Sequence, residues 1–133
     1  QKNKLSQNKQ AGPRKKPERV EGTLSCELPK LLVKKNDIHI TSKRNFDCFQ
    51  DTELDMLLKR TLNVKNIIIC GVNTDTCVYG TTFGASNRGY NPIVIECCTG
   101  SMRGEDQHQT ALKIMSQSIA WVMKKEEILN KLN

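Results

Sequence analysis

The residues best suited to do chemistry lie between an apolar run and a helix, in the sequence IIICGVNTDTCV that ends at Val78. Cys77 falls in the first turn of the predicted helix, where backbone N–H groups have no partner and the helix dipole is positive. Both features favour a thiolate, and the same N–H groups can hold an oxyanion. This turn can supply a nucleophile and stabilise its transition state, although Cys77 could equally be an ordinary packing residue.

The other five cysteines could instead indicate a disulfide framework or a zinc site. The six thiols stand at positions 26, 48, 70, 77, 97 and 98 without any CxxC pair, and neither His39 nor His108 is at ligand spacing. We therefore predict reduced cysteines in a cytoplasmic protein, with no metal and no cofactor. The adjacent Cys97 and Cys98 are interpreted as packing residues, with redox reactivity as the alternative.

Strand and helix signals alternate along the chain, which predicts an α/β fold with a parallel sheet. In such folds ligands bind at the carboxyl ends of strands, which is where Cys77 is expected. One helix is predicted to begin after an N-cap at Thr52. A second runs from near Cys77 to Gly89, a third spans 105–123, and residues 124–133 form a short helical end. The predicted strands are 37–41, 67–72 and 93–96.

The charge of the chain is concentrated at its beginning. The net charge is +7, but residues 1–20 hold seven basic residues and one acidic residue, which leaves residues 21–133 at +1. We interpret 1–20 as a basic polar tail or linker and 21–133 as the folded domain. A tail of this kind attracts phosphate non-specifically and is screened by salt, so we expect no specific nucleic acid partner. The longest apolar run is too short to cross a membrane.

The segment GVNTDTCV (Gly71 to Val78) resembles the nucleophile motif of the isochorismatase-like cysteine hydrolases, which include nicotinamidases, N-carbamoylsarcosine amidases and biuret hydrolases. The following NRGY and the strand Pro92 to Glu96 match as well. Upstream, KRNFDCFQDTELDMLL (Lys43 to Leu58) resembles the family's lysine segment, and EGTLSCELP (Glu21 to Pro29) resembles the loop before it. The resemblance covers about residues 21–123 and implies a three-layer, Rossmann-like parallel sheet.

The resemblance also implies roles for individual residues. It makes Cys77 the nucleophile and Lys43 the lysine of the catalytic triad, with the backbone N–H groups of Asn73 and Cys77 as the oxyanion hole. It implies a cis peptide between Val72 and Asn73. A nearby ammonium group favours both a thiolate and a negative intermediate. Without the motif, Lys43 would be interpreted as a solvated lysine beside Arg44.

The third member of the family's triad is an aspartate at the end of the first strand, and no residue is assigned to that role here. Asp37 is the one aspartate before Lys43, while Glu21 and Glu27 lie in the loop region, and none follows an apolar strand. We therefore expect an incomplete sheet with its first strands missing and a wide apolar surface exposed, as in a fragment, a splice product or one half of a complex. Glu96 also departs from the family, which usually has Asp there.

These features predict a hydrolase that cleaves a C–N bond of a small-molecule amide or ureide through a Cys77 thioester. Without the aspartate, the chain by itself is expected to be inactive. If completed, it is expected to form a homo-oligomer. The alternative is a non-catalytic remnant or partner-binding fragment of the same fold, and a nucleic-acid-associated module is disfavoured by the nearly neutral domain.

Overall fold

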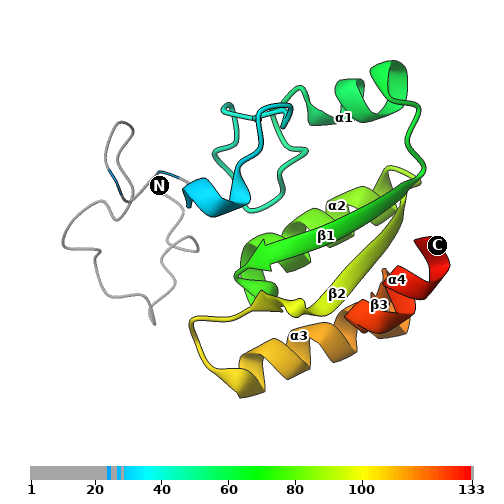
Figure 1. Cartoon of the computed structure of the whole chain (residues 1–133). Helices are drawn as coiled ribbons and strands as arrows, with labels where there is room; N and C mark the ends of the chain where they lie inside the picture. Colours follow the sequence, from blue (N-terminus) through cyan, green and yellow to red (C-terminus); the bar gives the residue numbers. More distant parts are fainter. Residues whose placement is uncertain (1–23, 25–26, 28, 133) are drawn as a thin grey trace, which may run out of the picture. The chain divides into compact units, whose positions relative to one another are not determined.

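A computed structural model describes residues 24, 27 and 29–132, which form two units divided between Ile38 and His39 (Figure 1). The predicted tail 1–20 and most of the loop 21–29 lie outside the described residues. The described part of the first unit contains one short 3-10 helix, η3 (Lys30–Leu32), whose residues are exposed.

The predicted strand at residues 37–41 is wrong, because these residues belong to no helix or strand. Ile38 in this segment is 60% exposed. The alternation in DIHIT describes how side chains would point on a strand, but a strand also needs a neighbour that accepts its backbone hydrogen bonds. In the described part of the chain, no strand pairs with this segment.

The second unit is built on a parallel three-stranded sheet in the order β1-β2-β3 (Figure 1). The strands are β1 (Asn66–Val72), β2 (Asn91–Gly100) and β3 (Trp121–Met123). The predicted parallel pairing of the strands at 67–72 and 93–96 is confirmed, with Ile69 beside Val94. Among the described residues, β1 is an edge strand, and its second edge is open.

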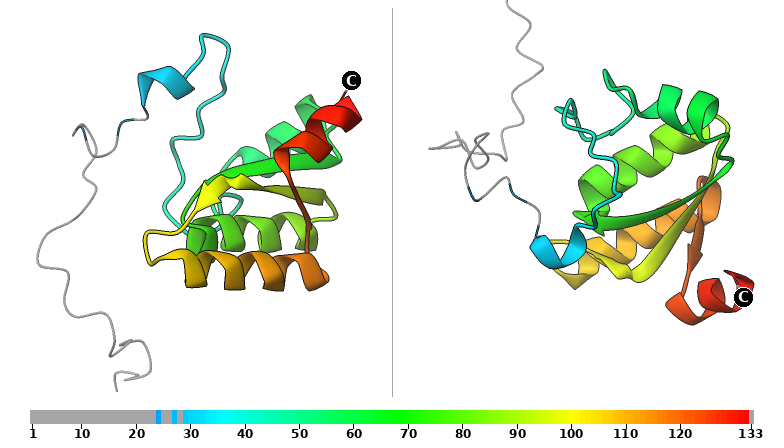
Figure 2. Two further views of the ribbon diagram at one scale, coloured as in Figure 1. Left: turned by 60° about the horizontal axis from the view of Figure 1, so that its bottom comes forward. Right: turned by 45° about the horizontal axis from the view of Figure 1, so that its top comes forward.

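Helices cover one face of this sheet. The π-helical turn η5 (Thr74–Val78) continues into α2 (Tyr79–Asn87), and α3 (Glu105–Ser118) lies beside α2 on the same side (Figure 2). Two right-handed crossovers that advance in the same direction place both helices on one face, as observed. The last helix, α4 (Lys125–Leu132), lies on the other side of the sheet. No helix among the described residues has the length and apolar content needed to cross a membrane.

The helical segment predicted after Thr52 is present as α1 (Leu54–Met56) and the π-helical turn η4 (Leu57–Thr61). Its N-cap is Glu53, one residue after the predicted Thr52, but the Thr52 hydroxyl does accept a hydrogen bond from the Leu54 N–H at 3.4 Å. The same hydroxyl donates to the Cys48 carbonyl at 2.5 Å. This hydrogen bond ties the start of the helical segment to the loop before it.

The hydrophobic core lies between the sheet and the helices α2 and α3. Ile67 and Ile69 of β1 pack toward these helices and are half-buried and buried, whereas Ile68 between them is exposed. The opposite face of the sheet therefore keeps large apolar side chains in contact with solvent, including Ile68 at 45%, Val72 at 58% and Trp121 at 69% exposure. The core residues are Phe49, Ile69, Val78, Ala85, Tyr90, Val94, Leu112 and Met115.

The predicted helix at 105–123 is too long. It ends at Ser118, where the N–H groups of Ile119 and Ala120 both donate to the Met115 carbonyl at 3.0 Å. The next residues form β3, in which Val122 lies beside Val94 of β2. Val122 fits the helical spacing by position, but as part of a strand it packs against the core and gains a ladder with β2.

Candidate active site

Cys77 lies in η5, immediately after the carboxyl end of β1. The turn begins at Asn73, which has extended backbone angles, and the peptide bond between Val72 and Asn73 is cis. The Asn73 carbonyl accepts hydrogen bonds from the N–H groups of Thr76 and Val78, the two neighbours of Cys77, both at 3.1 Å. This wide turn holds the half-buried Cys77 at the start of a continuous helical segment.

Two hydrogen bonds fasten this turn to the loop that follows β2. The Asn73 side-chain oxygen accepts from the Met102 N–H at 3.1 Å, and the Asp75 carboxylate accepts from the Ser101 hydroxyl at 2.7 Å. Arg103 adds an ion pair with Asp75 at 2.6 Å. These contacts hold the carboxyl ends of the adjacent strands β1 and β2 together beside the turn that contains Cys77.

A third connection is buried beneath the turn. The Thr74 hydroxyl lies 2.8 Å from Nδ1 of His108 on α3, and the two residues are 0% and 7% exposed. Sequence reasoning considered His108 only as a zinc ligand and did not identify its pairing with Thr74. The order of the strands predicts this contact, because the carboxyl ends of adjacent parallel strands lie at the same edge of the sheet. Residues just after β2 and at the start of α3 therefore lie close to the end of β1.

The charge of Asp75 is stabilised by this network. Burial acts to raise the pKa of its carboxyl group, but hydrogen bonds from Ser101 and Arg103 outweigh burial and hold that pKa below its ordinary value. A group whose pKa is depressed in the folded state contributes stability above the pKa of the unfolded chain, about 3.9 for Asp. That contribution is lost as the pH falls through the folded-state value.

We expect Asp75→Asn to lower the free energy of unfolding at neutral pH, with a difference from wild type that shrinks below about pH 4. Urea unfolding followed by circular dichroism across the acid range measures this difference. Asp106→Asn, which changes an exposed carboxylate on α3, serves as the matched control and should have a smaller effect. A difference for Asp75→Asn that stays constant with pH would contradict the stabilising role of the ionised carboxylate.

Lys43 lies in the irregular segment before α1 and is half-buried. Its Nζ donates to the Asn45 carbonyl at 2.7 Å. Among the described residues, no hydrogen bond or ion pair joins Lys43 to Cys77. The structure therefore brings Asn73 and Cys77 together in one turn, while Lys43 belongs to a separate segment.

That separate segment packs directly on α2. A Cβ added at Gly80 would lie 3.3 Å from Cβ of Phe46, and one added at Gly84 would collide with the Asp47 carboxylate. The two missing side chains thus allow the segment to lie close against the helix. This contact holds Phe46 and Asp47 against α2, the helix that continues from the turn containing Cys77.

Polar and aromatic contacts secure the same interface. Asp47 pairs with Arg88 at 3.2 Å, and the Arg88 guanidinium lies 4.9 Å from the centre of the Phe49 ring. The Cys48 thiol contacts the Thr81 hydroxyl at 3.1 Å. Burial raises the pKa of Cys48 even though the hydrogen bond with Thr81 opposes it. Cys48 therefore remains a protonated thiol at neutral pH and serves as a packing residue.

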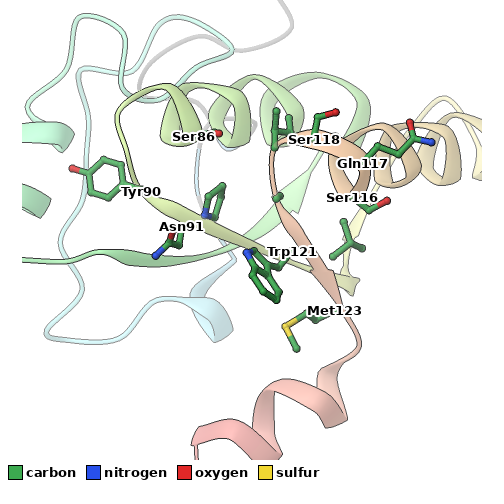
Figure 3. Close-up of a pocket in the computed structure, with 12 residues that line it drawn as sticks. Ser86, Tyr90, Asn91, Ser116, Gln117, Ser118, Trp121 and Met123 are labelled. Atoms are coloured by element: carbon green, nitrogen blue, oxygen red, sulfur yellow. The ribbon is translucent and has the colours of Figure 1, made fainter.

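A pocket of about 560 Å³ lies elsewhere, at the amino-terminal end of the sheet (Figure 3). It is bounded by Tyr90 and Asn91 at the start of β2, by the end of α3, and by Trp121 and Met123 on β3. Because Cys77 follows the carboxyl end of β1, this pocket is separate from the nucleophile. Within residues 24, 27 and 29–132, no group of three or more His, Cys, Asp or Glu side chains is arranged to hold a metal ion.

Comparison with known proteins identifies relatives across most of the chain. The isochorismatase domain family matches residues 3–127. An uncharacterised isochorismatase family protein of Escherichia coli O157:H7, YecD, is 33% identical over 97 residues, which cover 73% of this chain and 50% of that protein. A second such protein, YwoC of Bacillus subtilis, is 28% identical and is covered to 54%. The chain thus spans about half the length of the curated relatives it matches.

Solved structures show the same similarity. An isochorismatase-like hydrolase from Alkaliphilus metalliredigens superposes with a TM-score of 0.79 at 27% identity, covering 86% of this chain and 63% of that one. The nicotinamidase of Staphylococcus aureus is 35% identical with a TM-score of 0.58, covering 62% of this chain and 50% of that one. These matches confirm the predicted fold class.

Proposed function

Because this chain belongs to the isochorismatase domain family, we propose that it carries the nucleophile half of a hydrolase that cleaves a C–N bond of a small amide or ureide. The observation that carries the proposal is the position of Cys77, which lies in a helical turn directly after the carboxyl end of a parallel strand. The similarity to a nicotinamidase supports an amide over other hydrolase substrates.

The reaction follows from the groups around this turn. After the Cys77 thiol gives up its proton to a base, its sulfur attacks the amide carbonyl carbon and forms a tetrahedral oxyanion. The N–H groups of Asn73 and Cys77 hold that oxyanion, and the proposed role of Lys43 is to add positive charge from the segment before α1. The intermediate collapses with loss of the protonated amine, leaving a thioester that water hydrolyses to the acid and the free thiol.

The chain by itself is proposed to be inactive, because no residue in it is assigned as the base. General-base assistance contributes about 10²–10⁴-fold to reactions of this kind. We therefore expect the purified chain to release ammonia from nicotinamide, biuret or N-carbamoyl compounds no faster than buffer. Adding the part of the Alkaliphilus metalliredigens hydrolase that this chain does not cover, as a separate polypeptide, should produce turnover in the associated complex.

Size-exclusion chromatography of the mixture establishes that the two polypeptides associate before the assay is interpreted. Turnover by the chain alone that disappears in Cys77→Ala would show that the base lies within the chain. An associated complex that fails to hydrolyse any of these substrates would contradict the amidase proposal.

A second candidate function is partner binding by a non-catalytic domain. It is favoured by the apolar sheet face, where Ile68, Val72 and Trp121 are each 45% exposed or more. Exposed apolar surface of this kind is typical of protein interfaces. The complementation experiment also tests this candidate, since association without turnover would support it. We further propose a cytoplasmic location, because the five described cysteines are all free thiols.

A further inference from the structure

Three of the free cysteines gather where the ladder between β1 and β2 is interrupted. The regular pairing stops at Ile69 beside Val94 and resumes at Gly71 beside Thr99. Cys70 is the single residue of β1 inside this interruption, whereas β2 passes through four residues that include Cys97 and Cys98. An irregularity of this kind places extra residues of one strand opposite one residue of the other.

Cys70 and Cys98 each stand one residue before a paired position. Gly71 lies beside Thr99, so the two cysteines immediately precede paired residues of adjacent strands, at the point where the ladder is interrupted. Neighbouring strands lie about 4.8 Å apart, within the range of about 4.4–6.8 Å that disulfide-bonded Cα atoms span. Cys70 and Ile69 are successive residues of β1, so Cys70 points away from the core that Ile69 joins.

All three thiols are accessible. Cys70, Cys97 and Cys98 are exposed, and Sγ of Cys97 lies 4.0 Å from Sγ of Cys98. Burial by its surroundings raises the pKa of Cys70, and the neighbouring thiols of Cys98 and Cys97 raise it further. Among the neighbouring thiols, Cys98 has the larger influence on Cys70, which is consistent with two side chains that lie close to each other.

We propose that Cys70 and Cys98 form a reversible cross-strand disulfide, which is a thiol-redox site separate from the Cys77 turn. The oxidant is a low-molecular-weight disulfide such as oxidised glutathione. Cys97 lies beside the pair but is not one of its members, because Cys98 and not Cys97 directly precedes Thr99, the residue paired with Gly71.

Thiol–disulfide exchange with oxidised glutathione proceeds in two steps. The thiolate of Cys98 attacks one sulfur of the glutathione disulfide, which forms a mixed disulfide and releases one glutathione thiolate that takes up a proton. The Cys70 thiol then loses its proton and attacks the Cys98 sulfur, which forms the protein disulfide and releases the second glutathione. Two protein thiols are oxidised and one glutathione disulfide is reduced to two thiols.

This disulfide would fasten β1 to β2 close to the proposed catalytic turn. Cys70 is three residues before Asn73, and Cys98 is three residues before Ser101, whose hydroxyl binds Asp75. Both ends of the Asn73–Asp75 network therefore lie directly beyond the pair. Oxidation would restrict how far the ends of the two strands can separate, so the redox state of the pair is positioned to affect the geometry of the turn.

Incubation of the folded full chain with oxidised glutathione, followed by alkylation and tryptic mass mapping, tests the proposal. The expected product joins the peptide of residues 66–88 to the peptide of residues 89–103, with a loss of two free thiols per chain. Cys70→Ser and Cys98→Ser should reduce this product to background and accumulate a glutathione adduct on the remaining partner. Cys97→Ser and Cys77→Ala should retain it, which assigns the bond within each peptide.

Each alternative result has a definite meaning. A disulfide between Cys97 and Cys98, a bond to Cys26, or independent glutathione adducts on all exposed thiols in wild type would overturn the proposal. Circular dichroism of each variant establishes that it is folded. Repeating the oxidation in denaturing urea should abolish the preference for Cys70 and Cys98, and a preference that persists there would show that the fold does not determine the pairing.

Discussion

Cys77→Ala is expected to abolish ammonia release by the complemented protein, with a loss on the order of 10⁴-fold or more, as is typical when a catalytic nucleophile is removed. The reason is that the remaining oxyanion-hole N–H groups can stabilise a transition state but cannot form the thioester. Continuous measurement of ammonia from nicotinamide gives the rate. Cys97→Ala removes an exposed thiol on β2 outside the turn and serves as the matched control.

The thioester itself provides a second readout. Rapid acid quenching during turnover should trap an acyl group on the peptide of residues 66–88, and Cys77→Ala should remove that mass. An acyl group that persists in Cys77→Ala would assign the nucleophile to Cys70, the other cysteine of this peptide. Full activity in Cys77→Ala would contradict the role proposed for the turn.

Much of the sheet and its first crossover could be predicted because the signals are local. The apolar run from Ile67 to Val72 predicts a strand covered on both faces, and Gly89, which has a φ of +81°, marks the end of the helix that follows. The strand is present, but the expected cover is wrong for one face, because Ile68 and Val72 are 45% and 58% exposed. Parallel pairing then follows from the length of the connection, since a helix between two strands requires a crossover. The strand, the helix end and the parallel pairing depend on short stretches of sequence, and the structure confirms these three predictions.

The errors concern segments whose structure depends on a distant partner. Residues 121–123 continue a helical spacing, yet they form β3 because β2 offers a free edge there. Residues 37–41 alternate as a strand should, yet no strand pairs with them among the described residues. The pattern of apolar residues along a segment constrains which side chains face the core. Whether the segment forms a strand depends on whether another strand with a free edge lies beside it.

The candidate site likewise combines features that local sequence predicts with contacts between residues far apart in the chain. The sequence IIICGVNTDTCV predicts the location of Cys77 in a turn after a strand. The residues that brace the turn were not predicted, because Ser101, Arg103 and His108 lie 26, 28 and 34 positions from their partners in the turn. Such contacts become predictable only when the order of the strands is known, since that order decides which loops meet at the edge of the sheet.

Met115→Ala is expected to reduce the free energy of unfolding by about 2–5 kcal/mol, the range typical of Met-to-Ala changes in a core. Met115 is fully buried at 0% exposure and packs in the cluster that includes Val94 and Leu112, between α3 and the sheet. Truncation removes apolar contacts and leaves a cavity that the surrounding strands and helices cannot fill completely. Urea denaturation followed by far-ultraviolet circular dichroism measures the loss.

The adjacent residue supplies a control on the same helix. Ile114 is 45% exposed, so Ile114→Ala should cost less than about 1 kcal/mol. Both substitutions introduce alanine at neighbouring positions of α3, so their difference isolates burial from helix propensity. Equal losses in the two variants would mean that α3 does not present Met115 to the sheet, and the packing that positions His108 beneath the Cys77 turn would then be wrong as well.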